Sequence, residues 1–177
     1  MTSEASILEQ IDTAVIGETD GRLMLSTREE NRLASQHMAA QARNTICIAS
    51  RDLDAAIYDT QEFCDGVRHL ATSNRAARIQ IMVWDTSRII NDGHRLVELM
   101  RRLTSFIDIK TPARQHTDYN EALLVVDETA YIHRELADRF EADANFNARR
   151  EATHYAKQFK EMWDYGLHDP NLRRLHI

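Results

Sequence analysis

The sequence predicts an α/β domain in which a mixed sheet is flanked by helices on both faces. Segments with helical periodicity alternate with short apolar runs, which is the pattern of layered α/β proteins. Glycine (5) and proline (2) are scarce, which disfavours long linkers and a many-turn β architecture. The run LLVV at residues 123–126 is apolar at every position, as in a strand that is covered on both faces. With 177 residues and 43% hydrophobic side chains, we expect one domain with its own core.

Each element follows from a local pattern. Cap candidates and early glutamates predict a helix over 27–42, and Gly166 is placed to end the last helix, which carries an apolar stripe. Further helices are expected at 60–74, at 147–166 and within 85–103, over the second half of that segment at least. Strands are expected at 45–50, 78–84 and 106–110. ALLVVD and AYIHR are expected to be consecutive strands, because only ET separates them. Residues 1–26, which include the turn signal GETDGR, are expected to form an irregular arm before the domain at 27–177.

Composition narrows the function classes. The formal net charge of −6 disfavours a general polyanion binder, so we do not expect nucleic acid as a partner. Cys47 and Cys64 lack metal-ligand spacing and are interpreted as packed thiols in a reducing compartment. No apolar run reaches membrane-spanning length, and the first residues lack a basic segment followed by an apolar one. We therefore expect a cytoplasmic protein without membrane insertion, metal or cofactor.

One stretch, NEALLVVD at residues 120–127, resembles a known motif. The phospholipase D-like superfamily carries His-x-Lys-x-x-x-x-Asp on a strand, followed after a short strand by Gly-Ser-x-Asn. On that pattern, Asn120 stands at the histidine, Ala122 at the lysine and Asp127 at the aspartate. Downstream, ADANF places Ala142 and Asp143 at the Gly-Ser pair and Asn145 at the asparagine. The order of elements over 27–166 also resembles one phospholipase D-like half, as in small bacterial domains of that superfamily.

The departures from the motif bear on activity. The resemblance implies that the histidine would be the nucleophile and that the lysine would stabilise charge on phosphate oxygens. Asn120 offers no nucleophilic ring nitrogen, and an amide does not exchange a proton near neutral pH. Ala122 offers no cation. We therefore expect a catalytically inactive, degenerate domain. Active relatives bring two such motifs together, so the single motif here implies a homodimer.

Other residues are candidates for a site near the motif. Arg51 and Asp52 follow the first predicted strand, at the sheet edge where α/β proteins tend to bind ligands, although an internal ion pair explains them equally well. His116, in a polar loop, and His94, at the start of a helical run, could serve as a base, but a solvated loop and a helix start are simpler interpretations. On a strand, Glu121 points away from Asn120 and Ala122.

Three functions remain open. The first is a non-catalytic module for interaction or ligand sensing, dimeric and working beside a partner enzyme, with Asn120, Asp127, Asp143, Asn145, Arg51 and Asp52 lining the degenerate cleft. The second is a hydrolase or transferase of altered chemistry that uses this cleft with His116 or His94 as base. The third is a nucleic-acid-binding module.

Overall fold

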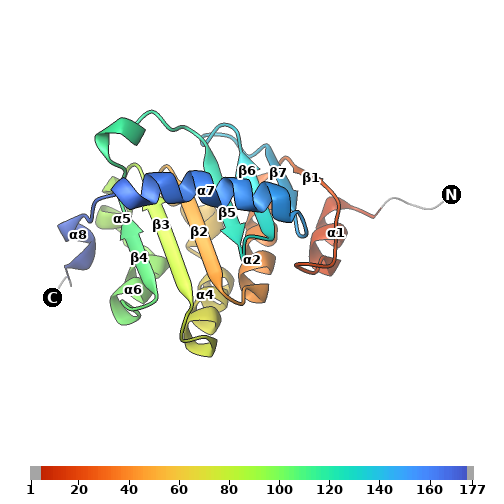
Figure 1. Cartoon of the computed structure of the whole chain (residues 1–177), viewed down its shortest axis with the longest axis horizontal. Helices are drawn as coiled ribbons and strands as arrows, with labels where there is room; N and C mark the ends of the chain where they lie inside the picture. Colours follow the sequence, from red (N-terminus) through yellow and green to blue (C-terminus); the bar gives the residue numbers. More distant parts are fainter. Residues whose placement is uncertain (1–4, 175–177) are drawn as a thin grey trace.

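The computed structural model describes residues 5–174 and has one seven-stranded mixed sheet (Figure 1). Its strands are β1 (Leu23–Leu25), β2 (Thr45–Ser50), β3 (Arg78–Val83), β4 (Ile107–Lys110), β5 (Ala122–Val126), β6 (Ala130–Arg134) and β7 (Ala142–Asn145). They are ordered β1-β7-β6-β5-β2-β3-β4. β2, β3 and β4 run parallel to one another, and every other neighbouring pair is antiparallel.

Helices cover both faces of the sheet. They are α1 (Ile7–Thr13), α2 (Arg28–Gln41), α3 (Ala55–Tyr58), α4 (Gln61–Ser73), α5 (Ser87–Asp92), α6 (Arg95–Arg102), α7 (Arg149–Tyr165) and α8 (Pro170–Arg173), with a 3₁₀ turn η1 (Arg114–His116). Figure 1 shows α7 lying along one face, while α2, α4 and α6 lie on the other. This arrangement confirms the predicted α/β class.

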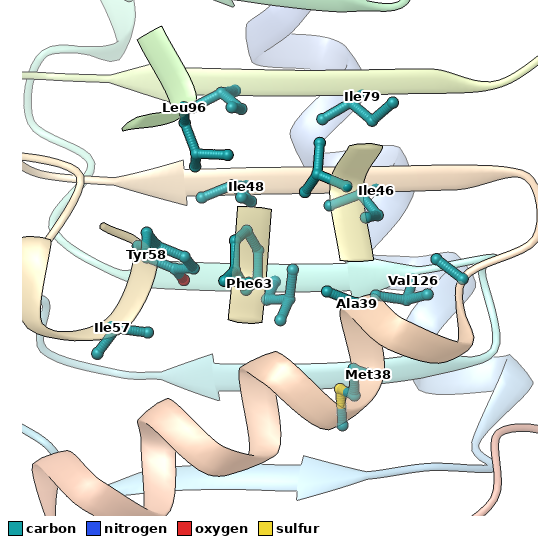
Figure 2. Close-up of a cluster of buried hydrophobic side chains, with 14 of the residues drawn as sticks. Met38, Ala39, Ile46, Ile48, Ile57, Tyr58, Phe63, Ile79, Leu96 and Val126 are labelled. Atoms are coloured by element: carbon teal, nitrogen blue, oxygen red, sulfur yellow. The ribbon is translucent and has the colours of Figure 1, made fainter. Parts of the chain in front are cut away.

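The two faces carry separate apolar cores. The larger core lies between the sheet and α2, α4 and α6, where Phe63 lies beside Ile48 and Ala39 lies beside Val126 (Figure 2). The smaller core lies under α7 and includes Phe159 and other side chains of that helix. Alternate residues of β5 enter opposite cores, which is why the whole strand is buried and why its sequence shows no polar alternation.

The hairpin of β5 and β6 has the tight turn that the sequence predicts. Asp127 and Glu128 both have positive φ angles, of 54° and 48°, as a type I′ hairpin turn requires. An aspartate tolerates this region better than most residues do. The hairpin is paired from Ala122↔Arg134 to Val126↔Ala130, which fixes the side of the sheet to which each of its residues points.

The predicted irregular arm at residues 1–26 is wrong for much of its length. Residues 1–4 lie outside the described part, but α1 and β1 are regular elements, and β1 is a sheet strand paired with β7. Ile11 and Leu25 are buried in the main core. Ser6 and Glu9 form a capping box at the start of α1, a local signal that the glycines nearby obscured.

The segment 85–103, expected to be helical over its second half at least, contains two helices. α5 ends at Gly93, which has a φ of 76°, and α6 starts afresh with His94 as its N-cap.

Cys64 is buried and Cys47 is half-buried, and both are free thiols. None of the helices within residues 5–174 has the length and apolar character needed to cross a membrane.

Candidate functional site

The predicted site residues Arg51 and Asn120 meet where the neighbouring central strands β2 and β5 respectively end and begin. β2 and β5 are antiparallel, with Ala49 opposite Leu123, so Arg51, the residue after β2, lies beside the two residues that precede β5. The Arg51 guanidinium donates a hydrogen bond of 3.1 Å to the Asn120 side-chain oxygen. Both side chains are exposed. We call this place the Arg51–Asn120 edge.

Acidic groups surround this edge. Asp52 lies 3.6 Å from the Arg88 guanidinium, an exposed pair that contributes little to stability. The Asp85 carboxylate accepts hydrogen bonds from the Ser87 hydroxyl and backbone N–H, which hold the pKa of Asp85 below its ordinary value. The edge therefore presents both donors and fixed carboxylates, a combination suited to binding polar groups.

Ala122 is 5% exposed and belongs to the side of β5 that faces the main core. The motif position that carries lysine in active relatives is therefore a small buried apolar residue here. Asn120, two residues earlier, has its side-chain oxygen engaged by Arg51. Neither position supplies a nucleophile or a cation.

Asp127 lies at the opposite end of β5 from Asn120, roughly 20 Å away along the strand at 3.3 Å per residue. Its carboxylate accepts hydrogen bonds from three consecutive backbone N–H groups, those of Arg43, Asn44 and Thr45, at 2.7 to 2.8 Å. The aspartate thus fastens the hairpin turn to the start of β2. It does not share a cleft with Asn120.

Asp143 and Asn145 do not complete a site with Asn120 either. Asn145 pairs with Tyr131, toward the Asp127 end of the hairpin, and is buried. Its side-chain oxygen accepts the backbone N–H of Asn147 at 2.9 Å and its amide donates to Asp20, so it shapes the turn that leads into α7. Asp143 forms a 2.8 Å ion pair with Arg22 on the α7 face. The single cleft expected from the sequence is divided between the two ends of the hairpin.

The two histidines considered as bases have different surroundings. His94 is buried, with Nε2 3.0 Å from the Leu53 carbonyl and Nδ1 accepting the Leu96 backbone N–H at 3.1 Å. Burial lowers the pKa of His94. Both ring nitrogens are engaged in holding the start of α6, so neither is free to take a proton from a substrate.

His116 lies in η1, with its ring 6.1 Å from the Tyr165 ring. Its Nδ1 is buried and has no partner among residues 5–174, and its backbone carbonyl accepts the Trp84 indole N–H. Trp84 stacks on Tyr119, whose hydroxyl is also buried without a partner in the described chain. Burial raises the pKa of Tyr119. Ring contacts and the hydrogen bond from the Trp84 indole to the His116 carbonyl hold this loop in place.

A polar cluster that the sequence interpretation missed lies on the α7 face. His133 Nε2 is 2.6 Å from the Glu121 carboxylate, and the His133 ring stacks on Tyr155 with centroids 4.7 Å apart. Beside it is a cleft of about 540 Å³ between β1, the β6–β7 loop and α7. Its lining residues are Arg22, Met24, His133, Glu135, Leu136, Arg139, Glu141, Ala142, Asp143 and Tyr155. We call this space the His133 cleft.

The register explains the Glu121–His133 contact. His133 is opposite Leu123, so Glu121 is its diagonal neighbour on the same face. The sequence predicts that Glu121 points away from Asn120. Identifying His133 as the partner of Glu121 requires the exact register between β5 and β6. No group of three or more His, Cys, Asp and Glu side chains within residues 5–174 is placed to hold a metal ion.

One protein-family model matches most of the chain. A protein-family model described as "Domain of unknown function (DUF7931)" matches residues 27–175. No curated protein matches the chain in sequence.

Several solved structures share the fold. TrmBL2, described as an archaeal chromatin protein with a novel mode of DNA binding, superposes with a TM-score of 0.61 at 14% identity, covering 89% of this chain and 56% of that one. Nuc from Salmonella typhimurium, a phospholipase D family member, gives 0.55 at 14% identity and covers 84% and 97%. NucT from Helicobacter pylori gives 0.57 at 11% identity and covers 85% and 99%. The chain thus spans just over half of TrmBL2 but nearly the whole of Nuc and NucT, and it has the fold of a phospholipase D-like half.

Proposed function

This chain belongs to the DUF7931 family, and on that premise we propose that it is a non-catalytic phospholipase D-like domain that serves as an interaction or ligand-sensing module. One observation carries the proposal. The motif positions that would perform chemistry are Asn120 and Ala122, whereas the retained residues Asp127 and Asn145 are occupied by structural hydrogen bonds. The scaffold of the motif is kept and its chemical groups are replaced.

The replacements remove two separate parts of phosphoryl transfer. An amide cannot become a covalent phosphate carrier, and it does not exchange protons near neutral pH. A buried alanine provides no charge to stabilise a developing oxyanion. Hydrolysis of a phosphodiester by the route of the active relatives therefore has neither a nucleophile nor its electrostatic support.

Binding remains chemically available at the Arg51–Asn120 edge. A guanidinium has five N–H donors, and the Arg51 side chain makes one hydrogen bond within residues 5–174, to Asn120. The Asn120 amide nitrogen also has no partner there. The Asp52 carboxylate is paired with Arg88 and the Asp85 carboxylate with Ser87, which leaves the guanidinium and the amide to donate to a ligand rich in acceptor oxygens, such as a carboxylate or a phosphate group.

Titration with inorganic phosphate and with acetate tests the binding part of the proposal. We expect backbone NMR signals around Arg51 and Asn120 to shift and Arg51→Ala to abolish the shift. Arg114→Ala, which removes an exposed arginine from η1, is the matched control and should leave the shift intact. Anions that leave both residues unchanged, or that act equally on the Arg51→Ala variant, would count against binding at this edge.

We also propose that the module is a homodimer, as the single motif implies. Light scattering on the purified chain should then give twice the monomer mass of 20.5 kDa. A monomer mass at all concentrations tested would remove the dimer from the proposal but would leave the non-catalytic role intact.

A second candidate, nucleic-acid binding, is favoured by three exposed arginines near the starts of β2 and β3, at the opposite ends of the strands from Arg51. Arg43 precedes β2, Arg75 precedes β3 and Arg78 begins it, and none has an ion-pair partner among residues 5–174. The likeness to the DNA-binding chromatin protein also supports this candidate. Salt-sensitive retardation of duplex DNA that is lost when all three become alanine would favour it. DNA that is not retarded at low salt would exclude it.

A further inference from the structure

The His133–Glu121 pair holds an imidazole in a fixed orientation, unlike a solvated surface contact. Nε2 of His133 lies 2.6 Å from the carboxylate, and the side chains are 12% and 37% exposed. The ring is also held from one side by Tyr155, with centroids 4.7 Å apart and planes 24° apart. Two contacts of different kinds therefore fix the orientation of one imidazole.

The hydrogen bond to Glu121 sets the tautomer. A carboxylate accepts, so Nε2 carries the proton, and in the neutral imidazole Nδ1 is then a hydrogen-bond acceptor. Nδ1 has no partner among residues 5–174 and is not sealed from solvent, and His133 lines the cleft. A ligand in the cleft can satisfy this nitrogen by donating a hydrogen bond to it.

The charges around the cleft favour a cationic donor. Arg22 and Asp143 neutralise each other at 2.8 Å. Glu135 and Glu141 then outnumber Arg139, and all three are exposed. These carboxylates add a charge preference to the geometric requirement that the oriented imidazole sets.

The size and the rim of the cleft suit a small molecule. A volume of about 540 Å³ lies within the range of small-ligand sites. Two apolar side chains, Met24 and Leu136, lie at its rim and are 56% and 42% exposed. They provide contact area for a short apolar segment of the ligand.

We propose that the His133 cleft binds a small ligand in which an amine or guanidinium group is carried on a short apolar chain. The cationic group donates to Nδ1 of His133 and pairs with Glu135 and Glu141, while Met24 and Leu136 contact the apolar chain. The proposal involves neither Asn120 nor Ala122, so it stands or falls separately from the non-catalytic role.

Agmatine, which has a guanidinium and an amine on a four-carbon chain, is the first probe. In imidazole NMR spectra of the full chain, we expect agmatine to shift the His133 ring signals and to leave those of the exposed His69 on α4 unchanged. Glu121→Gln should weaken binding by about tenfold, because the imidazole loses the partner that orients it. The exposed pair Glu135→Gln and Glu141→Gln together should weaken it to a similar extent.

Controls separate the site from general charge effects. Glu62→Gln removes an exposed carboxylate on the other face of the domain and should leave the affinity unchanged. A tripeptide with a central arginine and blocked ends distinguishes a peptide side chain from a free small molecule, according to which probe binds more tightly. The inference is overturned if neither probe shifts His133, or if butyrate produces the same shift as agmatine.

Discussion

The Asp127 carboxylate accepts the backbone N–H of Asn44 at 2.7 Å, across 83 residues of sequence. The neighbouring N–H groups of Arg43 and Thr45 bind the same carboxylate, and the Asp127 N–H donates to the Thr45 carbonyl. The aspartate of the motif is therefore an anchor between a hairpin turn and the start of a central strand. Its retention fits a need for the fold and says nothing in favour of catalysis.

Replacing this anchor should destabilise the domain. Asp127→Ala removes three charge-assisted hydrogen bonds and places alanine at a φ of 54°, and we expect the free energy of unfolding to fall by about 2–4 kcal/mol. Asp127→Asn should cost less, because asparagine tolerates this φ and keeps one acceptor. Urea unfolding followed by tryptophan fluorescence measures both. An alanine variant as stable as the wild type would show that the three hydrogen bonds contribute nothing.

The buried cap of α6 should make stability depend on pH. Burial lowers the pKa of His94 in the folded state, so below pH of about 6.5 the unfolded chain binds more protons than the folded one. Stability should therefore fall as the pH drops from about 6.5 toward 5. His94→Asn keeps a capping side chain without this titration. The difference in unfolding free energy between wild type and variant should change over that range, and a constant difference would contradict the role of His94.

The contact between α2 and α4 depends on Gly66. A Cβ atom at this position would lie 2.8 Å from the Ala39 carbonyl carbon and 2.9 Å from the Ala40 nitrogen. Glycine to alanine inside a helix normally stabilises by up to about 1 kcal/mol, but here we expect Gly66→Ala to destabilise by about 1–3 kcal/mol. Ser73→Ala, exposed at the end of the same helix, is the control. Thermal unfolding measures the change, and a Gly66→Ala variant that is more stable than the wild type would contradict the close contact between α2 and α4.

Both thiols should be unreactive in the folded protein. Burial raises the pKa of Cys47 to about 12 and that of Cys64 to about 11. A thiol reagent at pH 8 should therefore label neither in buffer and both in urea. Because the folded state holds these protons more tightly, stability should also fall as the pH rises above about 9. Rapid labelling of either cysteine before unfolding would contradict the raised pKa values of the two thiols.

The sequence predicts best those elements that have their own local signals. Thr27 and Glu30 form the capping box at the start of α2, and Gly166 ends α7, as the sequence predicts. The sequence does not predict β1 and β7, because strands of three and four residues carry too little apolar pattern. Their position depends on the pairing of β7 with β6 and of β1 with β7. The second half of 85–103 is helical as predicted, in α6, but the break before it had no signal of its own, because the apolar periodicity continues across Gly93, whose positive φ ends α5.

The same reasoning explains the success and failure at the site. Arg51 and Asn120 meet because strand direction alone brings the end of β2 to the start of β5. Asp127 and Asn120 belong to one sequence motif but not to one cleft, because the buried strand β5 separates them. His133 was missed because its contact with Glu121 is diagonal and requires the register of the hairpin.

The most direct test of the non-catalytic role is a phosphodiesterase assay with bis(p-nitrophenyl) phosphate in the presence of a chelator. We predict that the wild-type chain releases p-nitrophenol no faster than buffer does, and that Asn120→Ala and Arg51→Ala behave identically. Both substituted side chains are exposed, so these variants should keep the wild-type unfolding midpoint. Turnover by the wild type that disappears in a folded Asn120→Ala variant would contradict the account.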